Sequence, residues 1–201
     1  MTMALWLLLW ASALAADTDF KFLKRSGDCT YFFKQGVDSV PAMRAECEWS
    51  DVSLEQLDAM LGRYEDYDDY IFPITTSVIR SYKDDATLLF QRHKVFGFAP
   101  RESLVWIGRY PVVDGFEIRW SRATEHPLLV SPGAVETTVN EGFWRVVERV
   151  DGGVRIEHQV RVEAGAGLPK WLVSFFRTQG FIRIMGTVRA YGHSEVVVSK
   201  P

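Results

Sequence analysis

The sequence predicts a single α+β domain in which one antiparallel sheet packs against a C-terminal helix. Three observations support this: several short segments alternate between apolar and polar residues, turn residues separate these segments, and an apolar helical segment follows the last of them. The 201 residues suit one domain, at roughly 100–200 residues per domain. Hydrophobic residues make up 47% and charged residues 24% of the chain, which excludes a disordered protein.

Residues 1–16 have the pattern of a secretory signal peptide. They contain no charged side chain, and the apolar run 4–14 is shorter than the about 20 residues that span a bilayer. Residues 13–15 fit a small-x-small cleavage site. We therefore expect a secreted or periplasmic protein, and no cysteine follows the site to carry a lipid anchor. An uncleaved anchor at the membrane surface and a wrongly assigned first residue are the alternatives.

The two cysteines are expected to form a disulfide. An exported chain with an even number of cysteines is typical of an oxidising compartment. Cys29 and Cys47 lie in strand-like segments on either side of the turn-like residues 36–41, so a hairpin there places them opposite each other. The spacing is not CxxC and no histidine lies nearby, which disfavours a catalytic or metal-binding pair.

A helix and a series of strands follow the cysteines. Ser53 and Gln56 form a capping box that opens a helix. The acidic-aromatic run 64–70 is interpreted as the solvated end of that helix, since its spacing is not that of a calcium loop. Regular turn signals then divide the predicted strands 74–82, 87–96, 102–110, 116–121, 135–150 and 154–163.

The last predicted strand has one buried and one solvent-facing side. Val154, Ile156, Val160 and Val162 share the apolar face with His158, whose buried imidazole needs a hydrogen-bond partner. A satisfied core histidine is the favoured interpretation, with a ligand-orienting group as the alternative. Trp144 joins this face if residues 151–153 form a three-residue loop, whereas a two-residue turn would place Phe143 there.

The C-terminal helix is predicted to begin at Pro169 and is apolar around most of its circumference. That apolar surface is wider than one sheet face requires. Arg183 is expected to reach the rim with its aliphatic stem buried, with a headgroup contact as the alternative. The stripe expected to face the sheet consists of Leu172, Phe175, Phe176, Gln179, Ile182 and Gly186.

A candidate gate lies between two prolines. Leu128, Leu129 and Val130 are consecutive apolar residues in a predicted loop, and such a loop must pack on something or contact a membrane. Packing against the C-terminal helix as a lid is expected, and transient membrane contact during ligand exchange is compatible with it.

Two strands, a helix, a long antiparallel run and a final helix form the element order of the helix-grip architecture. Motifs that resemble the START family of lipid-transfer domains are Tyr67-Asp-Asp-Tyr70 leading to Pro73, Ala99-Pro-Arg-Glu-Ser-Leu-Val, Glu141-Gly-Phe-Trp-Arg-Val, and Gly165-Ala-Gly-Leu-Pro-Lys-Trp-Leu-Val. Glu102 stands where the family usually has Asp, and we expect it to pair with Arg101 as a strand opens. The strand before Gly142 lacks the arginine that the family often has. The resemblance implies a curved sheet wrapped around a long C-terminal helix, with a tunnel for one lipid-like molecule.

The sequence thus predicts a signal peptide (1–16), a short N-terminal segment (17–28), a START-like domain (29–192) and a tail (193–201). The expected function is binding of a lipid or sterol-like ligand, with possible transfer between membranes. No catalytic motif, phosphate loop or metal-spaced histidine pair is present, so we expect neither an enzyme nor a cofactor. An isoelectric point near 5.8 without a basic cluster argues against nucleic acid. One alternative is a polyketide cyclase-like enzyme using His158 with Arg183 or Glu157, although Glu157 alternates to the solvent-facing side of its strand. The other is a protein-interaction accessory with a small or filled cavity.

Overall fold

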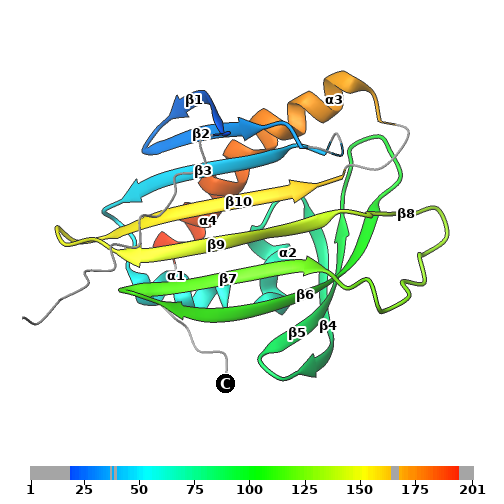
Figure 1. The fold of residues 1–201 in the computed structure, drawn as a ribbon, viewed down its shortest axis with the longest axis horizontal. Coiled ribbons are helices and arrows are strands. Elements are labelled where there is room, and N and C mark those ends of the chain that lie inside the picture. The colour runs from blue at the N-terminus through cyan, green and yellow to red at the C-terminus, as the bar shows by residue number, and fades with distance from the viewer. Residues whose placement is uncertain (1–18, 37, 39, 164–167, 195–201) are drawn as a thin grey trace, which may run out of the picture.

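The computed structural model describes residues 19–36, 38, 40–163 and 168–194. The predicted signal peptide and residues 195–201 of the predicted tail lie outside this range. Within it, ten strands form one sheet in the order β1-β2-β3-β10-β9-β7-β6-β5-β4, while β8 pairs with β6. The sheet curves without closing, and the C-terminal helical segment runs across one of its faces (Figure 1). The predicted α+β architecture, with an antiparallel sheet around a long C-terminal helix, is confirmed.

The elements follow in this order: β1 (Lys21–Ser26), β2 (Cys29–Lys34), β3 (Ala42–Trp49), α1 (Leu54–Leu61), a 3₁₀ turn (Tyr64–Asp66), α2 (Tyr67–Tyr70), β4 (Ile74–Lys83), β5 (Ala86–His93), β6 (Arg101–Val112), β7 (Gly115–Arg122), β8 (Val135–Glu136), β9 (Asn140–Glu148), β10 (Val154–Val162), α3 (Lys170–Phe175), a π-helical turn (Phe176–Gly180) and α4 (Phe181–Ser194).

The hairpin of β2 and β3 is as predicted. Cys29 lies opposite Cys47 in the register, and the two form a disulfide. The segment before it differs from expectation, because β1 pairs with β2 at the edge of the sheet. Most residues of β1 are exposed, so the segment has no apolar alternation from which a strand could be predicted.

The predicted strand 135–150 is interrupted. β8 runs parallel to the start of β6, whereas β9 pairs with β7 and β10. Thr137 lies between them, and its amide donates to the carbonyl of Glu102. The chain therefore leaves β6 within a few residues and joins the sheet again at β9, so that Thr137 and Asn140 lie beside the beginning of β6.

The helix α1 begins with the predicted capping box of Ser53 and Gln56. Beyond it, the hydroxyls of Tyr67 and Tyr70 donate to the carbonyls of Leu61 and Met60 and so satisfy acceptors at the helix end. In the acidic-aromatic run, the residues at every third position face the core. Tyr64, Tyr67 and Tyr70 are buried, while Glu65, Asp68 and Asp69 are exposed.

The face that the C-terminal helix turns inward differs from the predicted stripe. Phe181, Met185, Val188 and Gly192 of α4 are buried, and Gly192 packs so close to Leu57 and Val52 that a Cβ there would lie 3.2 Å from either side chain. Gly186, placed in the predicted stripe, is exposed. Because the segment is apolar on most sides, its periodicity does not single out one face. The contacts with the sheet and α1 decide it.

Candidate ligand-binding cavity

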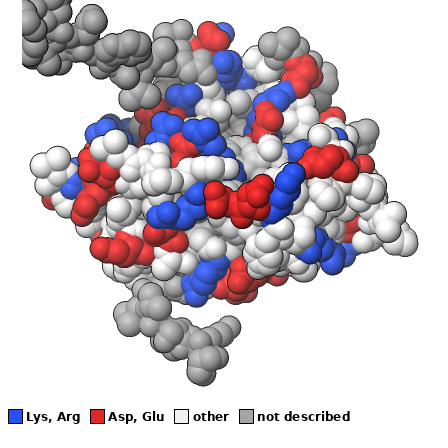
Figure 2. Space-filling model, turned by 60° about the horizontal axis from the view of Figure 1, so that its bottom comes forward, with Lys and Arg blue, Asp and Glu red and all other residues white. Residues whose placement is uncertain are grey.

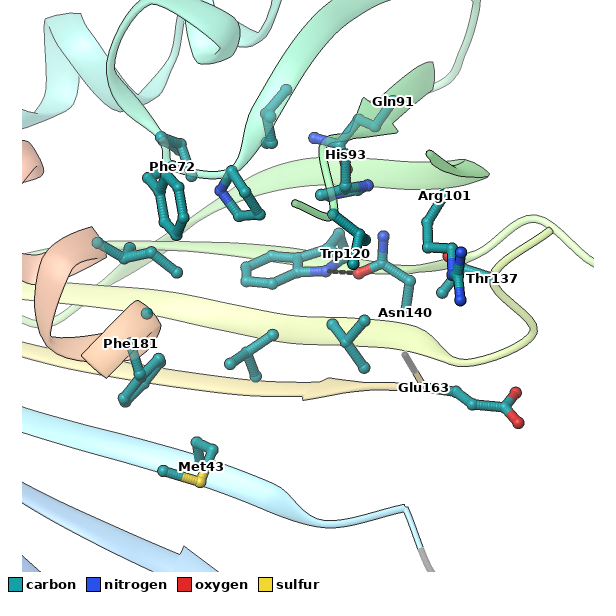
Figure 3. A pocket seen from close by; sticks show the side chains of 18 of the residues that line it. Met43, Phe72, Gln91, His93, Arg101, Trp120, Thr137, Asn140, Glu163 and Phe181 are labelled. Carbon is teal, nitrogen blue, oxygen red and sulfur yellow. Dashed lines mark hydrogen bonds between the residues drawn. The ribbon is translucent and has the colours of Figure 1, made fainter. Parts of the chain in front are cut away.

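A cavity of about 420 Å³ lies between the inner face of the sheet and the C-terminal helix. This volume falls within the roughly 300–1,000 Å³ of typical ligand pockets. Its apolar wall includes Met43, Ile107, Trp120, Trp144, Val160 and Phe181. Exposed Asp38 and Lys94 also line it, so the cavity reaches the surface on their side. Figure 3 shows side chains from the sheet and from α4 converging on this space.

The register of β9 and β10 settles which residues face the cavity. His158 lies opposite Trp144, and Ile156 lies opposite Val146. This is the arrangement expected for a loop with an odd number of residues, in which Trp144 shares the face of His158. Both side chains are buried and line the cavity.

His158 lies within a group of aromatic rings. Its ring stacks on Trp144 with centroids 3.5 Å apart, and Phe181 lies on it at 5.3 Å. Burial lowers the pKa of His158 to about 3, despite a hydrogen bond to the Phe143 carbonyl. The ring is therefore neutral at ordinary pH. Nδ1 lies 3.0 Å from that carbonyl and carries the proton, which leaves Nε2 as an acceptor.

A short chain of hydrogen bonds continues from this aromatic group along the inner face. The indole Nε1 of Trp120 donates to Asn140 Oδ1 over 2.9 Å, and Asn140 Nδ2 donates to Ser103 Oγ over 3.0 Å. These two bonds fix the orientation of the Asn140 amide. Trp120 and Asn140 thus connect the aromatic wall with a more polar part of the cavity (Figure 3).

That polar part was not predicted. Gln91 and His93 of β5 line the cavity together with Arg101, Thr137 and Asn140. Burial lowers the pKa of His93 to about 4, although a hydrogen bond to the Arg101 backbone acts in the opposite direction. Gln91 and His93 occupy alternate positions of a predicted strand, two and four residues after buried Leu89. This alternation was the sequence signal that could have revealed them.

Arg101 and Glu102 do not form the expected ion pair with each other. As adjacent residues of β6 they lie on opposite faces of the sheet. Arg101 lines the cavity, and its Nη1 donates to the Ala99 carbonyl over 2.6 Å. Glu102 instead pairs with Arg92 at 2.9 Å and accepts from the Ser131 amide. Glu102 thereby ties the loop before β8 to the sheet.

Neither a protein-family model nor a curated protein sequence matches this sequence. Solved structures do match. A STAR-related lipid transfer protein fragment from Xanthomonas axonopodis has 14% identity and a TM-score of 0.76, over 88% of this chain and 99% of that one. Human StAR-related lipid transfer protein 5 has 14% identity and a TM-score of 0.74, over 88% of each chain. Human STARD10 has 13% identity and a TM-score of 0.73, over 88% of this chain and 76% of that one.

The protein has the START fold. The predicted resemblance and the helix-grip architecture are thereby confirmed at the level of the fold. The structure is also similar to BexL, a di-domain ARO/CYC, at 12% identity and a TM-score of 0.51 over 80% of this chain and 50% of that one. The fold is therefore shared by lipid-transfer proteins and by proteins of another class.

Within this START fold, the predicted helix residues occupy different environments. Phe175 is 49% exposed, Gln179 is exposed, and Ile182 packs against the core. Arg183 lies over the ring of Phe72, with its guanidinium carbon 4.4 Å from the centroid, in a groove between α2 and α4. The side chains of Leu172 and Phe176 lie outside the described part of the structure.

The predicted gate residues, Leu128–Val130, are not among the residues that line the cavity. Leu129 is 92% exposed, while Leu128 and Val130 are partly buried. The cavity is lined instead by the helix residues Val173, Gly180, Phe181 and Ile184 and by the inner face of the sheet. A gating movement of Leu128–Val130 stays a prediction.

Two further properties concern the described residues alone. Among them, no group of three or more histidine, cysteine, aspartate or glutamate side chains is arranged to hold a metal ion. In the same range, each helix is too short or too polar to cross a membrane.

Proposed function

We propose that the protein binds a lipid or another hydrophobic ligand in its cavity and carries it through an aqueous compartment, between membranes. The observation that carries this proposal is the cavity of about 420 Å³ between the sheet and α4, walled by Trp120, Trp144 and Phe181. A core that served packing alone would fill such a space, since protein interiors are close-packed.

The mechanism is physical and needs no bond to be made or broken. Exposing an acyl chain to water costs about 0.8 kcal/mol per CH₂ group. The apolar wall removes this cost while the ligand is in transit. The exposed residues that line the cavity, Asp38 and Lys94, mark the side on which ligand enters and leaves.

The proposed compartment is the periplasm or the extracellular space. Two features support it: the signal-like residues 1–16, and the Cys29–Cys47 disulfide between paired strands. An oxidising environment would keep that bond formed, and the bond would hold the β2–β3 edge of the sheet in place.

An enzyme of the cyclase class is the second candidate, and the similarity to the ARO/CYC protein BexL favours it. Such an enzyme would need polar groups that act together on one ligand. His158 is neutral and stacked between rings, whereas Arg183 lies over Phe72 and outside the cavity wall. Because these two residues do not meet in the cavity, we favour binding over catalysis.

The third candidate, a protein-interaction accessory, predicts a filled or very small cavity. The volume of about 420 Å³ argues against it. Exposed Leu129 is compatible with either a membrane or a protein contact, and so it does not favour this candidate over a carrier.

Native mass spectrometry of the protein, expressed from the full sequence and purified without detergent from the extracellular or periplasmic fraction, tests the proposal. We expect an additional mass that leaves on collisional activation and is recovered as a lipid by solvent extraction. A chain that carries no such mass, and that stays unliganded after incubation with mixed lipids, would overturn the proposal. Transfer of labelled lipid between donor and acceptor vesicles then separates a carrier from a storage protein.

A further inference from the structure

The polar residues of the cavity gather at one end because of the strand register. On β5 and β6, His93 lies opposite Arg101 and Gln91 lies opposite Ser103. Thr137 is held beside them by its amide hydrogen bond to the Glu102 carbonyl. In Figure 3, Arg101 and Thr137 lie at one end of the cavity, whereas Phe72 and Phe181 lie toward the other. The cavity therefore has a polar end and an apolar end, as an amphiphile does.

One buried group at the polar end lacks a partner. The hydroxyl oxygen of Thr137 is inaccessible to water and makes no hydrogen bond to any described residue, and the residue is 1% exposed. An unsatisfied buried hydroxyl costs about 1–3 kcal/mol, so such groups are normally paired. Since Thr137 also lines the cavity, an atom of a bound ligand is a natural partner.

A buried positive charge lies at this end. Arg101 is 4% exposed and lines the cavity, and its guanidinium stays protonated even though burial lowers its pKa. His93 is neutral and adds no charge. Of the carboxylates nearby, Glu102 faces the other side of the sheet, where it binds Arg92 and Ser131.

Two further carboxylates line the cavity. Asp38 is exposed and pairs with Arg161. Glu163 is partly buried and lies at the same end of the cavity as Arg101 and Thr137 in Figure 3. Figure 3 shows Glu163 pointing away from Arg101 and the cavity centre. A buried cation next to an unsatisfied hydroxyl and the amide of Gln91 is a donor set suited to an oxyanion, because arginine offers several N–H donors in a planar fork.

We propose that Arg101, Thr137 and Gln91 bind the oxyanion headgroup of an amphiphilic ligand, a carboxylate or a phosphate, while the ligand's apolar tail lies along Trp120, Trp144 and Phe181. This inference rests on the proposed function and narrows it to anionic amphiphiles. Neutral lipids of equal tail length lack the negative charge that the guanidinium of Arg101 attracts, so we expect them to bind more weakly.

The experiment compares three probes that share one tail: dodecanoate, dodecyl phosphate and dodecanol. Binding to the delipidated full-length protein is measured by isothermal titration calorimetry below the critical micelle concentration of each probe. We expect at least one anionic probe to bind tenfold or more tightly than dodecanol. The better anionic probe identifies whether the headgroup is a carboxylate or a phosphate.

The variants assign the preference to the polar end. Arg101→Gln is expected to abolish the anionic preference while dodecanol binds as before, and Thr137→Val is expected to weaken anionic binding threefold to tenfold. Arg183→Gln is the matched control, because it removes an arginine that lies over Phe72 and away from the polar end of the cavity. This variant is expected to keep the wild-type preference for the anionic probes over dodecanol. Circular dichroism and thermal melting check each fold. If Arg101→Gln does not fold, Thr137→Val alone decides.

The outcomes separate the two proposals. Equal affinity of the wild type for all three probes, or an anionic preference that survives both Arg101→Gln and Thr137→Val, would overturn the headgroup site and leave the hydrophobic cavity as the binding site. Failure of all three probes, together with failure of mixed lipids in the mass-spectrometric experiment, would overturn the proposed function as well.

Discussion

The two faces of β7, β9 and β10 differ sharply although adjacent residues build them. On the outer face, Glu117 of β7 accepts from Arg145 of β9 over 2.7 Å, and Arg145 pairs with Glu157 of β10 at 3.4 Å. On the inner face, His158 of β10 stacks on Trp144 of β9 and is neutral. Acidic and basic side chains lie close together over the surface drawn in Figure 2.

The difference follows from where water can reach. On the outer face, ion pairs keep part of their hydration, so that even Glu117, which is 1% exposed, has arginines that extend into water. On the inner face, an unpaired charge would lose its hydration, and His158 therefore gives up its proton. The same strands thus carry charged side chains on their outer face and form an apolar cavity wall on their inner face.

Removing a ring from the inner face should have the largest effect. Trp144→Ala is expected to lower the free energy of unfolding by about 3–5 kcal/mol, since it removes a fully buried aromatic side chain. The matched control is Phe143→Ala, the next aromatic residue of the same strand but on the outer face, where about 1 kcal/mol is expected. Urea unfolding measures both, and equal losses would contradict the comparison.

The neutral state of His158 should make stability depend on pH. Because its folded pKa of about 3 lies below the ordinary value of 6.5, the unfolded chain binds the proton first as pH falls. Stability is thus complete above pH 6.5 and declines between about pH 6.5 and 3. His158 should account for about 2 kcal/mol of the loss from pH 7 to pH 5.

Comparing unfolding at pH 7 and pH 5 for the wild type and His158→Phe measures this contribution. The variant should lose about 2 kcal/mol less than the wild type over that interval. His93, whose folded pKa is about 4, titrates in the same direction in both proteins, so it cancels in the difference. His126→Phe replaces an exposed histidine and should keep the full wild-type loss. An identical pH dependence of His158→Phe and the wild type would contradict the prediction.

Breaking ion pairs of the outer face should lower the free energy of unfolding by a smaller amount, and the loss should be greater for the more buried pair. Arg145→Met leaves buried Glu117 with Arg119 as its remaining arginine, so a loss of about 1–2 kcal/mol is expected. Arg155→Met breaks a pair with Glu48 in which the side chains are 64% and 52% exposed, and less than about 1 kcal/mol is expected. Thermal melting at low salt compares the two. A larger effect at Arg155 would show that burial does not set the strength of these pairs.

Much of the fold could be predicted from local signals. The turn at 36–41 and the strand pattern around it placed Cys29 opposite Cys47, and the capping box of Ser53 and Gln56 fixed the start of α1. Alternation placed His158 on the buried face of β10. Each of these features depends on residues close in sequence, which is why the sequence revealed them.

The cavity's polar end could not be predicted in the same way. Gln91 and His93 come from β5, Arg101 from β6, and Thr137 from the segment between β8 and β9. Their proximity depends on the pairing of β5 with β6 and on the parallel contact of β8, which no local pattern encodes. The expected pairing of Arg101 with Glu102 was wrong for a different, local reason: adjacent residues of a strand point to opposite faces.

The sequence by itself determined the alternating strands, the turns between them, the start of α1 and the position of the disulfide, because hydrophobic period, turn chemistry and capping act over a few residues. The tertiary structure alone decided which side of the C-terminal helix faces the sheet, and which polar groups meet in the cavity. A helix that is apolar on most sides has no preferred face until Phe181 packs on His158 and Gly192 packs on Leu57. Long-range packing of this kind also brought Arg101 into the cavity wall. Among the described lining residues, Arg101 is the one buried cation.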